Sequence, residues 1–163
     1  MRDTDLIDPL LFAGNRQKIS GSLGLNELDA RVSSHEYLFD ASSNCQYQVV
    51  GSQDELGRDM LQIEIQTCLN LICQRCLKEM VFPVEKTSRI ILFTDDSALD
   101  KAMAEDDDLE GMLVVPQVSI KTLIEDEILI ALPLAPRHER CTHPQLEKIN
   151  RDKPNPFALL VDL

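Results

Sequence analysis

The sequence predicts an α+β fold in which an antiparallel sheet packs against a few short helices and one longer helix in the C-terminal half. Two patterns support this class. Apolar and polar residues alternate between Leu61 and Leu92, as in strands buried on one side, and apolar residues recur at helical spacing between Ile120 and Ala131. The chain of 163 residues is long enough for one domain, 1–163, with its own core.

Two short helices are expected near the N-terminus. Asp8-Pro9 is typical of an N-cap followed by proline in the first turn, which predicts a helix over residues 10–16. The apolar residues of 26–32 are spaced for one helix face, so a second short helix is expected there. Between them, the Ser-Gly-Ser-Leu-Gly sequence of residues 20–24 is interpreted as a flexible break.

The strands follow in the middle of the chain. Residues 45–50 are expected to join the sheet, and the alternating segments 61–69 and 82–92 predict an antiparallel hairpin. Residues 73–78 would then lie near the hairpin tip, where they carry a Cys-x-x-Cys knuckle. Residues 114–116 are interpreted as a last short strand.

Residues 95–110, the acidic segment, hold eight carboxylates and one base, Lys101, in a chain of net charge −12. Such a charge run predicts a solvated acidic loop. A calcium loop is disfavoured, because the segment lacks the alternating ligand spacing and central glycine of such loops. The acidity favours basic protein partners.

A helix is expected over residues 119–132, with Ser119 as its cap and Pro133 after its end. Leu129 and Ile130 lie away from its main apolar face. The last turn is therefore either enclosed on all sides or in contact with another molecule.

Glu127 projects from the middle of that apolar face, where an unpaired carboxylate would cost several kcal/mol. It is expected to have a structural role with Arg89 as its partner, while Glu125 and Asp126 are expected to be solvated. No nucleophile accompanies these acids, and the sequence contains no phosphate-binding loop or His-Glu-x-x-His helix, so an enzyme is disfavoured.

Residues 137–163 are expected to form an extended tail, because they contain three prolines and little periodicity. Phe157, after Pro154-Asn155-Pro156, is a candidate apolar anchor for a tail that straps back over the core.

Five cysteines, an odd number, and no secretory leader favour a cytoplasmic protein over a secreted one framed by disulfides. No apolar run approaches the roughly 20 residues needed to cross a bilayer, so a membrane-spanning protein is not expected.

Cys73 and Cys76 are the sharpest candidate site, since two thiols separated by two residues supply half of a four-coordinate zinc site. His138, Cys141 and His143 could complete it if the tail folds over the hairpin tip. The alternative is a pair of unmetallated thiols in a turn, so zinc is compatible with the sequence and is not assigned by it. A thioredoxin-like redox role is less favoured. That chemistry places the first thiol at the N-terminus of a helix, whereas here a strand precedes Cys73 and a polar turn follows it.

Three segments together resemble one family: Cys73-Gln74-Arg75-Cys76-Leu77, residues 118–133 with Glu-Asp-Glu at 125–127, and residues 153–160 with Lys-Pro-Asn-Pro-Phe. In this order and spacing they resemble the YceD family, bacterial and plastid proteins linked to accumulation of large-subunit ribosomal RNA. The resemblance spans nearly the whole chain. It implies a non-enzymatic role in synthesis, processing or stability of the large (23S) rRNA, and hence in assembly of the large subunit. Some members carry a second Cys-x-x-Cys where this chain has only Cys141.

Two mechanisms are compatible with this role. In the first, the hairpin contacts rRNA or a pre-ribosomal particle through four cations, which are Arg75, Lys78, Lys86 and Arg89. In the second, the protein is an acidic adaptor for a basic ribosomal protein or assembly factor. The candidate contacts of the adaptor are Asp106, Asp107, Asp108 and Leu129. The net charge favours the adaptor.

Overall fold

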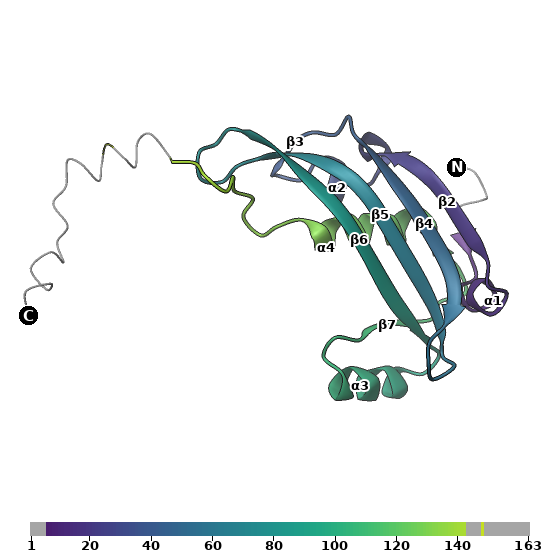
Figure 1. The fold of residues 1–163 in the computed structure, drawn as a ribbon. Helices are drawn as coiled ribbons and strands as arrows, with labels where there is room; N and C mark the ends of the chain where they lie inside the picture. Colours follow the sequence, from purple (N-terminus) through teal and green to yellow (C-terminus); the bar gives the residue numbers. More distant parts are fainter. Residues whose placement is uncertain (1–5, 143–147, 149–163) are drawn as a thin grey trace, which may run out of the picture.

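The computed structural model describes residues 6–142 and 148, and a mostly antiparallel six-stranded sheet dominates them (Figure 1). Its order is β2-β4-β5-β6-β7, and β3 also pairs with β5. The strands of this sheet are β2 (Lys18–Gly24), β3 (Leu38–Asp40), β4 (Asn44–Gln53), β5 (Asp59–Ile72), β6 (Glu79–Phe93) and β7 (Glu110–Leu113). A second, two-stranded sheet pairs β1 (Leu6–Ile7) with β8 (Val118–Ser119).

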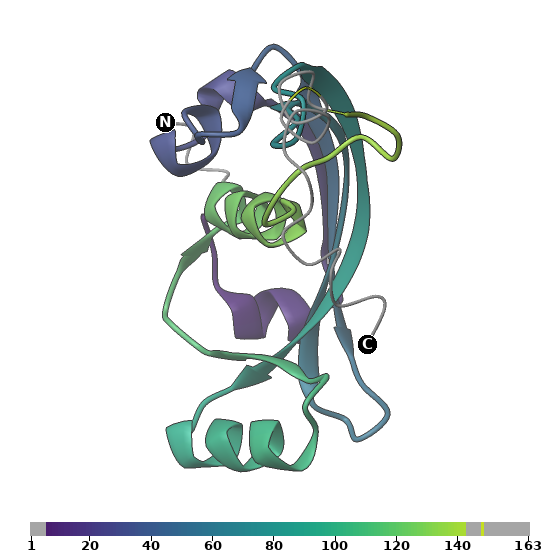
Figure 2. The ribbon, with the colours of Figure 1, turned by 90° about the vertical axis from the view of Figure 1, so that its left-hand side faces the viewer.

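In the described part of the chain, four α-helices and one 3-10 helix accompany the sheets. They are α1 (Pro9–Gly14), the 3-10 helix η2 (Leu25–Glu27), α2 (Ala30–Ser33), α3 (Asp96–Glu105) and α4 (Ile120–Ala131). α1, α2 and α4 lie on one face of the large sheet, as the edge-on view shows (Figure 2). The predicted α+β class, with antiparallel strands and short helices, is confirmed.

The long β5–β6 pair forms the centre of the sheet. Its antiparallel register runs from Met60 opposite Ile91 to Ile72 opposite Glu79. Every second residue of β5 from Leu61 onward is buried beneath the helices, because side chains alternate across a strand. The segments 61–69 and 82–92 therefore lie in neighbouring antiparallel strands, with residues 73–78 between them.

The core lies between this sheet and the helices. Phe12 of α1 and Ile124 and Ile128 of α4 are 0–1% exposed, and they belong to one cluster with buried β5 residues such as Leu61. α1 sits so close to β4 that a Cβ on Gly51 would lie 2.3 Å from the Phe12 carbonyl oxygen. Only glycine leaves room for this packing.

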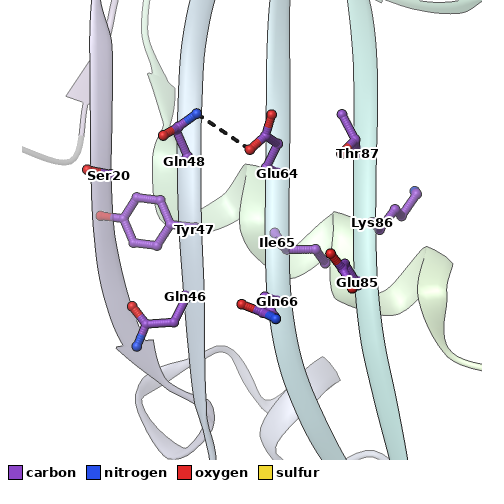
Figure 3. Close-up of a pocket in the computed structure, with 10 residues that line it drawn as sticks. All are labelled: Ser20, Gln46, Tyr47, Gln48, Glu64, Ile65, Gln66, Glu85, Lys86 and Thr87. Atoms are coloured by element: carbon purple, nitrogen blue, oxygen red, sulfur yellow. Dashed lines mark hydrogen bonds between the residues drawn. The ribbon is translucent and has the colours of Figure 1, made fainter.

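The opposite face of the sheet is not covered by a helix of the described chain and carries polar side chains (Figures 2 and 3). A shallow hollow of about 250 Å³ lies there beside residues of β4, β5 and β6. Gln48 Nε2 donates to Glu64 Oε2 at 3.5 Å across two of these strands (Figure 3). Amides and carboxylates of this kind suit a solvated sheet face.

Two N-terminal expectations need correction. Residues 20–24 are not a flexible break, because they form most of β2, which pairs with β4 along its whole length. Gly21 there makes room for the ring of Tyr47, whose atoms would clash with a Cβ at that position. The helix predicted over 26–32 is divided into η2 and α2, whereas the helix over 10–16 is present as α1 with Asp8 as its N-cap.

The acidic segment is also not a loop. Asp95 accepts a hydrogen bond from the Ala98 amide and caps α3, and Glu110 begins β7, which pairs in parallel with β6. Leu99 of α3 packs on Gly111, where a Cβ would lie 2.5 Å from the leucine methyl. The Asp95 cap and the contact of Leu99 with Gly111 stabilise α3 despite the repulsion among its carboxylates. The last strand expected at 114–116 is also wrong, because β7 ends at Leu113.

The helix predicted over 119–132 is present as α4, and the Ser119 hydroxyl accepts from the Thr122 amide at its N-terminus. Within the described chain, no helix has both the length and the apolar character needed to cross a membrane. Of the tail expected over residues 137–163, only 137–142 and 148 are described, and the candidate anchor Phe157 lies outside the described residues.

Candidate metal centre

The turn between β5 and β6 positions the paired thiols. The Cys73 amide donates to the Lys78 carbonyl at 2.9 Å, and the Leu77 amide donates to the Cys73 carbonyl at 2.9 Å. Leu77 has a φ of 58°, in the left-handed region that non-glycine residues seldom adopt. This backbone closes the turn tightly and holds residues 73–78 in one compact loop.

The chain after α4 passes beside this turn. The Gln74 amide donates to the Pro136 carbonyl at 2.7 Å, and Arg75 Nη1 donates to the Cys141 carbonyl at 3.1 Å. The two segments, far apart in sequence, also lie side by side in the ribbon (Figure 1). Residues 136–141 are therefore fixed against the turn by main-chain and side-chain hydrogen bonds.

Together these two segments form a cluster of four potential ligands, Cys73, Cys76, His138 and Cys141, called here the Cys/His cluster. Their ligand atoms all lie within 4.8 Å of one another. Cys73 Sγ is 3.6 Å from Cys141 Sγ, and Cys76 Sγ is 3.4 Å from His138 Nδ1. Tetrahedral zinc with Zn–S bonds of about 2.3 Å separates its ligand sulfurs by roughly 3.8 Å, so these spacings fit zinc.

The second ring nitrogen of His138 supports the same fit. Its Nε2 lies 3.2 Å from the Glu79 carbonyl oxygen. Metal-bound histidines usually donate their other N–H to a carbonyl or carboxylate, which fixes the tautomer that leaves the first nitrogen free for the metal. Three thiols and one imidazole are a donor set of structural zinc sites, which have no open position for a substrate.

The electrostatics of the cluster favour ionised sulfur. Burial of Cys73 opposes ionisation, but hydrogen bonds from the backbone of Cys76, His138 and Arg75 outweigh it and lower its pKa from 9.0 to about 5. Burial, followed by the neighbouring sulfurs of Cys73 and Cys76, raises the pKa of Cys141. Cys73 is therefore held as a thiolate at neutral pH, which is the form of cysteine that binds a metal.

The structure brings together four of the five sequence candidates for metal ligands. The fifth, His143, lies outside the described residues. Cys68, in contrast, is exposed on β5, and Cys45 is buried, with burial as the main cause that raises its pKa to about 11.

The four cations expected on one RNA-binding surface are not brought together. Arg75 and Lys78 lie in the turn, whereas Lys86 lies on the helix-covered side of β6, where it is paired with Glu127. Arg89 is exposed and lines a shallow hollow with Asp108 and Glu110. Alternation along β6 places neighbouring positions on opposite faces, which separates Lys86 from Arg89.

The sequence interpretation missed two other cations beside the cluster, Arg137 and Arg140. Arg140 joins Lys78 and Thr142 around a hollow of about 380 Å³ that is also lined by cluster residues. The dense basic sequence around His138 was the available signal for this surface.

Glu127 does need a partner, but the partner is not Arg89. Its Oε2 accepts from Lys86 Nζ at 2.7 Å and from Ser88 Oγ at 2.6 Å. Glu125 is not solvated either, because it is 4% exposed and its Oε1 accepts from the Asp29 amide at 2.8 Å. Both acids attach α4 to the elements around it.

Of the remaining partner candidates, the three aspartates lie at the other end of the molecule, whereas Leu129 lies in the last turn of α4. Asp106, Asp107 and Asp108 are exposed just after α3, which follows the far end of β6 from the Cys/His cluster (Figure 1). Leu129 is half-buried and packs against the core, whereas its neighbour Ile130 is 67% exposed.

Comparison with protein families identifies the family of this chain. The family described as "Large ribosomal RNA subunit accumulation protein YceD" matches residues 61–163, which include the thiol-bearing turn, the acidic segment and α4. No solved structure matches the chain.

Proposed function

This chain belongs to the YceD family of large ribosomal RNA subunit accumulation proteins, and from this premise we propose that it is a non-enzymatic factor of the cytoplasm. Its role is to support synthesis, processing or stability of large-subunit rRNA by acting as an acidic adaptor. The adaptor binds a basic ribosomal protein or assembly factor and brings it to the assembling subunit.

The unneutralised acidic segment carries this proposal. Among the described residues, the only ion pair that involves the segment joins Lys101 and Glu105 at 3.9 Å. α3 has no buried residue, so its carboxylates face water at one end of the sheet. A surface with so many unpaired acids attracts a cationic partner and accelerates encounter with it.

Zinc has a supporting part in the proposal. Cys73, Cys76, His138 and Cys141 would hold it, and the metal would cross-link the β5–β6 turn to the segment after α4. Four protein ligands leave no position for water activation, so the site is structural. This agrees with a factor that acts by binding.

A second candidate function, direct rRNA contact, is favoured by the cations at the Cys/His cluster. Lys78, Arg137 and Arg140 are exposed there, at the opposite end of β6 from the acidic segment. Phosphates would bind this end with strong salt dependence. Lys86 would not contribute to this RNA contact, because its ammonium is paired with Glu127.

The experiment compares cells that lack the gene and carry one of several variants, with the ratio of large to small rRNA as the readout. Asp107→Asn/Asp108→Asn tests the adaptor, Lys78→Glu/Arg140→Glu tests RNA contact, and Glu36→Gln/Glu85→Gln is the charge-matched control for the first pair. The adaptor predicts a selective loss of large rRNA in the first variant, together with slower binding to a purified basic large-subunit protein, mainly at low salt. Loss confined to the second variant would favour RNA contact instead.

A further inference from the structure

An apolar groove lies between α4 and the α3–β7 unit, with a volume of about 420 Å³. In the edge-on view, α3 and α4 lie on the same side of the sheet with β7 between them (Figure 2). The apolar residues lining the groove are Ile90, Met103, Leu109, Met112, Leu123 and Ile130.

Large apolar side chains in this groove remain accessible to solvent. Ile130 is 67% exposed in the last turn of α4, and Met103 is 48% exposed on α3. Residues of the described chain therefore leave much of both side chains uncovered. An exposed apolar hollow bordered by polar residues is typical of a binding surface, and methionine adapts its shape to different apolar partners.

The rim of the groove is acidic. Glu110, Asp126 and Glu127 line it, and the acidic segment supplies one wall. Asp126 is paired with Arg31 at 3.3 Å and Glu127 with Lys86, so neither attracts a partner strongly. Glu110 has no cation within ion-pair distance among the described residues, so it supplies the unpaired negative charge of the rim.

We propose that this groove binds a basic amphipathic segment of a partner protein. The apolar side of that segment covers Met103, Met112 and Ile130, and its Lys or Arg residues face Glu110 and the acidic segment. A helix laid into an apolar groove is a common mode of recognition, and the acidic rim selects a cationic helix. The inference rests on the proposed adaptor function and identifies where the basic partner binds.

Methionine methyl spectra of the full chain test the location directly. The chain has five methionines, of which Met103 and Met112 line the groove, whereas Met60 and Met80 lie elsewhere on the sheet. The probe is a synthetic amphipathic helical peptide of leucine and lysine. Its control is a serine and lysine peptide of equal charge and length. The first peptide should shift the Met103 and Met112 methyl signals while leaving Met80 unchanged, and the control peptide should not.

Substitution in the groove tests affinity. Ile130→Ser should weaken binding of the leucine peptide about tenfold, because serine removes the apolar side chain that the peptide would cover. Leu11→Ser is the matched control, because Leu11 is 63% exposed on α1, outside the groove. Both substitutions are at exposed sites, so thermal unfolding should show intact folds.

Several results would overturn the inference. These are equal binding of the two peptides, unchanged affinity of the Ile130→Ser protein, or methyl shifts that depend on protein concentration alone. The last result would assign the groove to a second copy of the chain. The proposed function fails on a different measurement, the rRNA ratio of cells without the gene, so the two failures are distinguishable.

Discussion

Lys86 Nζ lies 2.7 Å from Glu127 Oε2 and joins β6 to the middle of α4. The Glu127 side chain is 5% exposed and that of Lys86 is 23% exposed, so the carboxylate depends on its protein partners more than the ammonium does. Ser88 Oγ donates to the same oxygen. This pair fixes the position of α4 against the sheet, beside the apolar groove.

Removal of the cation should therefore cost more than removal of the acid. Lys86→Met leaves a buried carboxylate with one hydroxyl donor and is expected to lower the free energy of unfolding by about 3 kcal/mol. Glu127→Leu leaves a lysine that can reach water and should cost less. Urea unfolding measures both, with Lys18→Met on the exposed edge strand as the control. Equal losses for the two variants would contradict the asymmetry.

Glu125 should act as a hydrogen-bond acceptor rather than as a charge. Glu125→Gln keeps an oxygen for the Asp29 amide and should change stability little, whereas Glu125→Leu leaves that amide without its acceptor and should cost about 1–3 kcal/mol. The same urea measurement distinguishes them. Glu125 Oε2 also lies 3.7 Å from Arg31 Nη2. If the glutamine variant were as unstable as the leucine variant, this ion pair would be the more important contact.

The Cys/His cluster should bind about one zinc ion per chain. Cys73→Ser and His138→Ala should abolish stoichiometric zinc in protein purified without chelator, as measured by elemental analysis. Cys68→Ser is the matched control, because that thiol is exposed and outside the cluster. Retention of zinc by the Cys73→Ser protein would remove the proposed site.

The low pKa of Cys73 predicts a pH dependence for the metal-free protein. The folded thiol has a pKa of about 5, and the usual value is 9.0, so the thiolate contributes its full stability above pH 9 and loses it as the pH falls to 5. The difference in free energy of unfolding between wild type and Cys73→Ser should therefore grow from pH 5 to pH 9. Urea unfolding in the presence of chelator measures it, and thiolate absorbance supplies an independent titration.

Much of the fold could be predicted where local patterns and tertiary packing agree. The alternation of β5 and β6 and the capped helix α4 are visible in the sequence because one face of each element is buried. β2 was missed because its serines and glycines carry little strand signal, and only its pairing with β4 reveals why they are there. The acidic segment was misinterpreted because its net charge conceals a capped helix and the contact of Leu99 with Gly111.

The residues of the candidate site could be predicted from the sequence, but their arrangement in space could not. The ligands of the Cys/His cluster could be predicted, because a Cys-x-x-Cys pair with a further cysteine and histidines is typical of a metal site. It could not supply the hydrogen bond from Gln74 to Pro136 that brings the two halves into contact. The partner of Glu127 was missed for a related reason. Whether Lys86 or Arg89 lies on the face of β6 that packs against α4 depends on the register of β6 in the sheet.

The position of the Cys/His cluster has a consequence for the unfolded chain. Cys73 and Cys141 are 68 residues apart in sequence, and Cys76 and His138 are 62 apart. A metal ion that joins them would close one large loop containing β6, the acidic segment and α4. By analogy with a disulfide, such a closure reduces the entropy of the unfolded chain by the equivalent of about 4 kcal/mol. Zinc availability would then affect the fraction of chains in which the acidic surface and its neighbouring groove are folded binding sites.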